Sequence, residues 1–189
     1  MKMKKKACSA KNKNKAQQGF TLVELITVVI VIGVVALAVA PRFTGSSGYS
    51  EYALQKRFVS ALRNTQLKAM YDTRSGVCYR LNLVTGSSAS AAYGPSANSY
   101  LAGSVDNSCG SDINMQSPSY LRTDTAEINA EGLSFTAIDN AMPISYIQFS
   151  SEGLPLSSAG NCSNGCTFTF SGEDDAAVCV ADQGYVYVC

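Results

Sequence analysis

A long apolar stretch with a single charge dominates the first quarter of the chain. The 21 residues from Phe20 to Ala40 carry a single charged side chain, Glu24, and the stretch ends at Pro41. At about 1.5 Å per residue, a helix of this length spans roughly 32 Å, close to the ~30 Å hydrocarbon core of a bilayer. The sequence therefore predicts an apolar helix over residues 20–41 that is long enough to cross a membrane.

Charge is distributed unevenly on the two sides of this stretch. Residues 1–19 contain seven lysines and no acidic residue, whereas residues 123–189 contain nine acidic residues and neither Lys nor Arg. Because positive charge marks the cytoplasmic side of a membrane segment, we expect the N-terminus in the cytoplasm and the chain after Pro41 on the other side. A basic leader before an acidic body is typical of a targeting segment joined to an exported domain.

Two simpler interpretations of the apolar stretch remain open at this point. A cleaved secretory signal peptide would find a small-residue cleavage site at residues 38–40. Its apolar region, however, is normally only about 7–15 residues long, and Pro41 would directly follow the cut. A plain transmembrane anchor would leave Glu24 unexplained, because an acidic side chain at the centre of such a helix costs roughly 2.5–3.5 kcal/mol.

The residues at the start of the apolar stretch form a contiguous motif. Gly19 ends the basic leader, Phe20 and Glu24 belong to the segment Phe-Thr-Leu-Val-Glu, and Pro41 lies 21 residues after Phe20. This pattern resembles the N-terminal signal of the type IV prepilins and the type II secretion pseudopilins. The resemblance implies that a prepilin peptidase cleaves after Gly19 and that the new amine of Phe20 is methylated.

The same resemblance implies how the retained helix assembles. An apolar helix leaves the bilayer only by packing against other helices of its kind. Glu24 then becomes a buried carboxylate, and its partner in this family is the Phe20 amine of a neighbouring subunit. Such a pair at ~4 Å contributes on the order of 4 kcal/mol at an effective dielectric constant near 20, before desolvation. We interpret the pair as a device for register, and pairing of Glu24 with the Phe20 amine of its own chain remains the alternative.

A second, amphipathic helix is predicted within residues 42–76. The segment Thr44-Gly45-Ser46-Ser47-Gly48 is a poor helix former and indicates a joint. From Ser50, a candidate N-cap, to the stop at Ser75-Gly76, apolar or small residues recur at helical spacing. This stripe consists of Leu54, Phe58, Leu62, Thr65 and Ala69. We expect it to pack on the chain's own sheet, and a groove for a partner is the alternative.

Residues 77–189 predict a β-rich domain, because the apolar period changes to two. We expect strands at residues 77–83, 144–149, 167–170, 178–181 and 185–188. Between the first two lies an insertion near residues 84–143. In residues 86–111, 17 of 26 positions are Ser, Ala or Gly, which predicts a surface loop, and short strands or turns are expected at 112–143. The resemblance implies an α+β, type IV pilin-like fold, with a long N-terminal helix packed on a C-terminal antiparallel sheet.

Six cysteines remain after the expected removal of the leader, which contains Cys8: Cys78, Cys109, Cys162, Cys166, Cys179 and Cys189. An even count in an oxidising compartment indicates disulfides, and 15 pairings are open. Short separations favour Cys162–Cys166 and Cys179–Cys189, which leaves Cys78 with Cys109. Because the chain has no CxxC motif, a thiolate metal site is the weaker alternative.

The residue inventory excludes several classes of function. The chain has no His, which excludes Ser-His and Cys-His nucleophile pairs and imidazole metal ligands. We therefore expect no catalytic activity, no cofactor and no metal. The absence of Lys and Arg from residues 123–189 disfavours nucleic-acid binding. The acidic run at residues 173–175 could hold calcium, although a solvated turn is the simpler interpretation.

Weaker similarities suggest a subtype. The stretch at residues 51–70 is similar to minor pilins of the mannose-sensitive haemagglutinin (MSHA) type. The strand and turn at residues 144–155, together with Gly184-Tyr185-Val186, look like H-type minor pseudopilins. Our leading hypothesis is a minor pilin that enters or primes a type IV, MSHA-like pilus, and the alternative is a minor pseudopilin of a type II secretion system. The resemblance implies three partners: other pilin subunits, prepilin peptidase, and the inner membrane of a Gram-negative bacterium before assembly.

Overall fold

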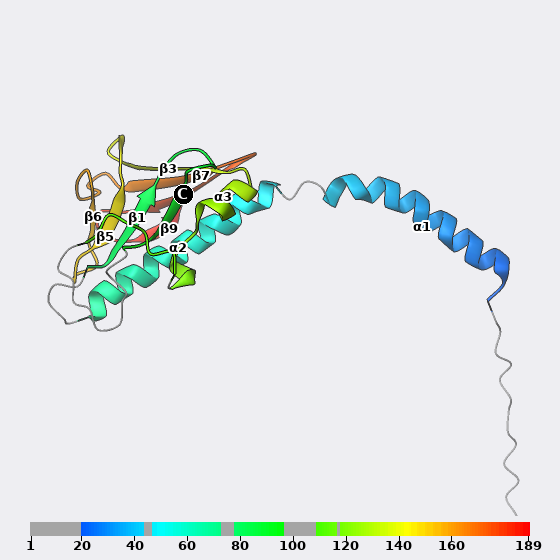
Figure 1. Ribbon diagram of the computed structural model, residues 1–189, viewed down its shortest axis with the longest axis horizontal. Coiled ribbons are helices and arrows are strands. Elements are labelled where there is room, and N and C mark those ends of the chain that lie inside the picture. Colours follow the sequence, from blue (N-terminus) through cyan, green and yellow to red (C-terminus); the bar gives the residue numbers. More distant parts are fainter. Residues whose placement is uncertain (1–19, 44–46, 73–77, 97–108, 117) are drawn as a thin grey trace, which may run out of the picture. The chain divides into compact units, whose positions relative to one another are not determined.

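A computed structural model describes residues 20–43, 47–72, 78–96, 109–116 and 118–189, without the side chains of residues 37–48 (Figure 1). The expected leader, including Cys8 and Gly19, lies outside the described residues. The chain divides into two compact units, Met1–Thr44 and Gly45–Cys189.

In the first unit the described residues form one helix, α1, which spans Leu22–Phe43. An uninterrupted apolar segment with one internal glycine and no internal proline before residue 41 favours a single helix here. We expected the helix to end at Pro41, but it continues for two further residues. Proline lacks the backbone N–H that would donate to the carbonyl group four residues earlier, so the last turn of α1 has one hydrogen bond fewer.

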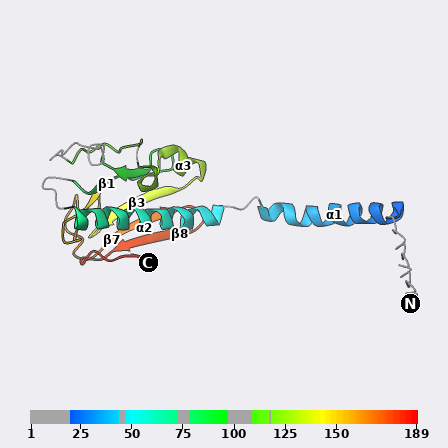
Figure 2. The same cartoon turned by 90° about the horizontal axis from the view of Figure 1, so that it is seen from below.

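The second unit is a helix packed on two antiparallel sheets. Helix α2 spans Ser47–Tyr71, and it contacts β7, β8 and β9 of one sheet and β1 and β5 of the other. Figure 2 shows α2 running between β1 on one side and β8 on the other. One sheet has the order β2-β1-β5-β6, formed by Ala92–Pro95, Arg80–Val84, Tyr146–Phe149 and Pro155–Ser157. The other has the order β4-β3-β7-β8-β9, formed by Met142–Pro143, Ser134–Asp139, Cys166–Ser171, Asp175–Val180 and Val186–Val188.

This architecture confirms the α+β class, with an N-terminal helix followed by antiparallel sheets, consistent with a type IV pilin-like fold. Several details differ from expectation. Helix α2 begins at Ser47, three residues before the candidate N-cap, so part of the expected joint is helical. The strands form two sheets where we expected one. Residues 86–111, expected as a surface loop, contain the strand β2. Residues 112–143, where short strands or turns were expected, contain the strands β3 and β4, together with a short 3-10 helix η1 at Ser119–Leu121 and a helix α3 at Thr125–Ala130.

The helical stripe on α2 is buried, as its spacing predicts. All five residues from Leu54 to Ala69 are nearly or fully shielded from solvent. Phe58 lies at the centre of an aromatic cluster, with ring centroids 4.7–5.8 Å from its neighbours. Those neighbours, contributed by both sheets, are Tyr93, Phe135, Phe168 and Phe170. The stripe therefore joins α2 to the chain's own sheets.

Two polar side chains of α2 attach it to the ends of the sheets. Gln66 donates hydrogen bonds from Nε2 to the carbonyl oxygens of Gly153 (2.8 Å) and Gly184 (2.7 Å), which lie in two separate turns. Gly184 has a φ of +84°, and a Cβ at this position would overlap the carbonyl oxygen of Gly153. Arg63 donates from Nη2 to the carbonyl oxygen of Val186 (2.8 Å), on the edge strand β9.

Three disulfides join the six cysteines of the second unit in the arrangement that short separations favour. The pairs are Cys78–Cys109, Cys162–Cys166 and Cys179–Cys189. The first joins Cys78, two residues before β1, to a described part of the insertion, and Arg80 donates a hydrogen bond to the carbonyl oxygen of Cys109 (3.2 Å). The third closes the β8–β9 hairpin.

Candidate functional site

At the start of α1, two threonines form hydrogen bonds with the backbone of Glu24. Thr21 acts as an N-cap, because its Oγ1 accepts a hydrogen bond from the backbone N–H of Glu24 (3.2 Å). Thr27 donates from Oγ1 to the carbonyl oxygen of Glu24 (2.9 Å). The cap places Phe20 just before the helix and Glu24 in its first turn. A carboxylate in this position interacts favourably with the positive end of the helix dipole.

Large apolar side chains project from all around helix α1, so its apolar surface is not confined to one face. Phe20, just before the helix, is 84% exposed, and even the least exposed large apolar side chain described in this segment, Ile26, is 48% exposed. The set comprises Phe20, Leu22, Val23, Leu25, Ile26, Val28, Val29, Ile30, Val31, Ile32, Val34 and Val35. A helix that is apolar all round is buried in its functional state, either in lipid or among other helices. This surface is therefore the candidate functional site.

The structure describes some of the predicted site residues fully and others in part or not at all. Phe20 and Glu24 lie within one turn of each other at the start of α1, and both are exposed. Pro41 lies in the last turn of α1, its side chain outside the described set, and Gly19 is outside the described residues altogether. Within the described residues, no ion pair involves Glu24. The expected salt bridge with a neighbour's Phe20 amine thus stays a prediction.

No helix in the described part of the chain combines the length and the apolar character needed to cross a membrane.

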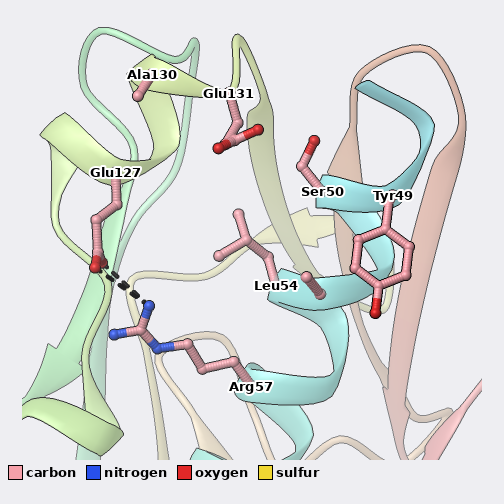
Figure 3. Close-up of a pocket in the computed structure, with 8 residues that line it drawn as sticks. Tyr49, Ser50, Leu54, Arg57, Glu127, Ala130 and Glu131 are labelled. Atoms are coloured by element: carbon pink, nitrogen blue, oxygen red, sulfur yellow. Dashed lines mark hydrogen bonds and ion pairs between the residues drawn. The ribbon is translucent and has the colours of Figure 1, made fainter. Parts of the chain in front are cut away.

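A pocket of about 470 Å³ lies between α2 and α3 (Figure 3). Its lining includes Tyr49, Ala53, Leu54, Arg57, Glu127 and Glu131. At its rim, Arg57 Nη1 lies 3.3 Å from the Glu127 carboxylate, in a pair that is partly exposed on both sides. The lining thus combines apolar side chains with one partly exposed ion pair.

Helix α3 is fixed in front of this pocket by a capping box. Asp124 Oδ1 accepts from the backbone N–H of Glu127 (2.9 Å), and the Glu127 side chain accepts from the backbone N–H of Asp124. The hydrogen bond from the Glu127 backbone holds the pKa of Asp124 below its ordinary value, with a smaller contribution from Arg122. Glu127 is thereby positioned opposite Arg57.

Few side chains in the described residues lie close enough together to bind a metal ion. One set of three potential ligands lies within 4.8 Å of one another, and it consists of Asp139, Cys162 and Cys166. The two sulfur atoms are joined in a disulfide, so they are not available as thiolate ligands. The acidic run at residues 173–175 forms no such set.

Sequence reasoning missed two polar residues. Thr21 caps α1, and the signal for this role was present, because a threonine stands immediately before the apolar periodicity. Glu51 is fully buried in α2 and accepts a hydrogen bond from the backbone N–H of Glu173, 122 residues away. Its position near the start of a helix is typical of a solvated acid, so nothing local in the sequence indicates its burial.

Comparison with known proteins identifies the segment around α1. Residues 14–40 match the family model described as the prokaryotic N-terminal methylation motif. No curated protein and no solved structure matches the chain. The motif covers the expected cleavage and methylation residues and most of α1. It implies processing by prepilin peptidase, a membrane-anchored stage, and assembly with other subunits. The matched segment thus supports the type IV pilin and pseudopilin family, whose members are structural subunits rather than enzymes.

Proposed function

We propose that this chain is a minor pilin, a non-catalytic subunit that enters or primes a type IV, MSHA-like pilus. The observation that carries the proposal is that Phe20 and the described part of α1 expose twelve large apolar side chains and one carboxylate, within a segment that mostly matches the methylation motif. Such a helix requires apolar surroundings on every side, and a bundle of identical or related helices supplies them. Residues 20–41 would first anchor the subunit in the inner membrane, with the disulfide-bonded domain in the periplasm.

Glu24 is the residue that gives this assembly its register. Once lipid or other helices surround α1, the carboxylate needs a positive partner, since an unpaired buried charge is very costly. Cleavage after Gly19 would create one, the Phe20 amine, at the end of each neighbouring subunit. Thr21 supports this arrangement, because its cap keeps Phe20 outside the helix.

The processing step can be tested by mass spectrometry of the chain recovered from surface fibres. We expect a mature N-terminus at Phe20 that carries one added methyl group. A start at Pro41, or a chain that retains its leader, would contradict the proposal. A catalytically inactive prepilin peptidase provides the control and should leave the full-length chain in the membrane.

A minor pseudopilin of a type II secretion system is the second candidate, because the methylation motif is common to both classes. The two differ in what deletion of the gene removes. Loss of surface fibres with normal secretion of folded proteins supports the pilus. Retention of those proteins in the periplasm, with normal surface fibres, supports the secretion system.

A further inference from the structure

Glu51 is a fully buried carboxylate whose two oxygens differ in their hydrogen bonding. Its Oε1 accepts hydrogen bonds from the backbone N–H groups of Glu173 (2.8 Å) and Asp174 (3.5 Å), in the turn between β7 and β8. Its Oε2 is buried and has no hydrogen-bond partner among the described residues. Leaving a charged oxygen buried and unpaired carries a large desolvation cost. The position therefore favours a bound positive charge.

A pocket of about 470 Å³ opens beside Glu51 and is lined almost entirely by oxygen-bearing side chains. Three of these are carboxylates, Glu51, Glu131 and Glu173, and Ser87 and Ser88 of the loop between β1 and β2 also line the pocket. No Lys or Arg lines the pocket. The lining thus carries a formal charge of −3 with no compensating cation of the protein.

We propose that this pocket binds one calcium ion, with Glu51 Oε2 as its buried ligand. Ca²⁺ takes six to eight oxygen ligands in flexible geometry, and the carboxylates, hydroxyls and entering water offer this number. Mg²⁺ requires a compact octahedral set and releases water reluctantly, which suits a wide pocket less well. The lining contains no sulfur or imidazole ligand, which disfavours softer metals.

The three carboxylates differ in how firmly they are held. Glu51 is fixed by the two amide donors, and Gly172 makes room for it, because a Cβ there would overlap Glu51 Oε1. Glu131, at the C-terminal end of α3, and Glu173, in the β7–β8 turn, are exposed. Without an ion the three are not gathered within ligand distance of one another. Binding therefore requires Glu131 and Glu173 to turn inward toward a preplaced Glu51.

This requirement predicts a modest affinity and a local effect. Sites in extracellular modules bind calcium with dissociation constants of about 10⁻⁴–10⁻³ M, and a site that must gather two ligands belongs in this range. The ion would link α2, α3 and the β7–β8 turn. Because it binds only the folded chain, it raises the melting temperature as its concentration rises.

The test is a calcium titration of the full chain, purified in detergent and freed of metal with a chelator. Calorimetry should show one Ca²⁺ per chain, with weaker or no binding of Mg²⁺, and the melting temperature should rise with calcium. Glu173→Gln should weaken binding by about tenfold or more, because it removes one charged ligand. Asp182→Asn is the matched control, since Asp182 is an exposed acid in a turn outside this pocket.

Glu51→Gln keeps an acceptor for the two amides and removes the buried charge, so it should abolish binding in a folded chain. If that variant fails to fold, Glu131→Gln and Glu173→Gln decide the question. Absence of binding at millimolar calcium would overturn the proposal. Equal binding by wild type, Glu173→Gln and Asp182→Asn would overturn it too, because it would show only a diffuse attraction to an acidic surface.

Discussion

The ring of Phe58 meets the ring of Tyr93 edge-on, with 4.7 Å between their centroids and 74° between their planes. Phe58 comes from α2 and Tyr93 from β2, a strand of the four-stranded sheet. The same phenylalanine contacts Phe168 of the five-stranded sheet at 5.0 Å. One side chain of the helix therefore connects both sheets.

Phe58→Ala should remove this connection and destabilise the second unit by about 3–5 kcal/mol, the usual cost of deleting a buried phenylalanine. The measurement is urea denaturation of oxidised protein, compared with the wild type. Leu67→Ala is the matched control, because Leu67 lies on the same helix and is about half exposed. A similar loss of stability in both variants would contradict the central role of Phe58.

Tyr93 should make stability fall at high pH. Burial raises the pKa of Tyr93 to about 12, from an ordinary value of 10.0. Below about pH 10 the phenol is neutral in both the folded and the unfolded chain, so ionisation of Tyr93 does not lower the free energy of unfolding there. As the pH rises toward 12, the unfolded chain loses the proton and the folded chain keeps it, and the free energy of unfolding falls by on the order of 2–3 kcal/mol.

The check is to measure unfolding between pH 8 and pH 12 in the wild type and in Tyr93→Phe. The variant lacks the phenol, so the difference between the two curves isolates Tyr93 from the lysines and from the exposed tyrosines. Parallel curves would show that the Tyr93 phenol ionises equally easily in the folded and unfolded states.

The three disulfides should be reduced in a definite order. Thiol-disulfide exchange requires access to a sulfur atom. Cys189 is exposed, whereas Cys162 and Cys166 are both fully buried. Under mild dithiothreitol treatment we expect Cys179–Cys189 to open first and Cys162–Cys166 last. Timed alkylation followed by peptide mass spectrometry gives the order, and early labelling of Cys162 would contradict the burial of that pair in solution.

Glu24→Gln should leave cleavage after Gly19 largely intact but lower the amount of the chain in sheared fibres. The amide keeps the size of the side chain and removes the charge that the Phe20 amine of a neighbour is expected to pair with. Glu24→Asp is the matched control, because it keeps the charge and should retain part of the incorporation. Equal incorporation of wild type and Glu24→Gln would refute the register role. The comparison is quantitative immunoblotting of membrane and fibre fractions.

The success of the sequence predictions depended on how local each signal was. The stripe from Leu54 to Ala69 follows helical periodicity, and its burial was predicted correctly. Strand β6 was missed, because Pro155 in Gly-Leu-Pro indicates a turn, whereas proline is also tolerated at the first residue of an edge strand. The four residues of β2 lie in a segment rich in small residues, and only pairing with β1 makes them a strand.

The functional residues likewise divide into those with a local sequence signal and those without one. The motif at Gly19, Phe20 and Glu24 is contiguous, so it was visible without any structure. The buried position of Glu51 depends on a turn 122 residues away, and no local pattern encodes such a contact. The division of the nine strands that the structure describes into two sheets depends likewise on pairings between distant segments, such as β3 with β7.

The contact between Arg63 and Val186 has a consequence for many copies held side by side. Strand β9 is the last strand of its sheet, so its outer carbonyl groups are open to pairing with a strand of another molecule. The guanidinium of Arg63 already occupies the carbonyl oxygen of Val186. A foreign strand would have to displace a charged donor before it could extend the sheet. Where copies of the domain are crowded, we expect this arginine to oppose aggregation by strand addition at β9.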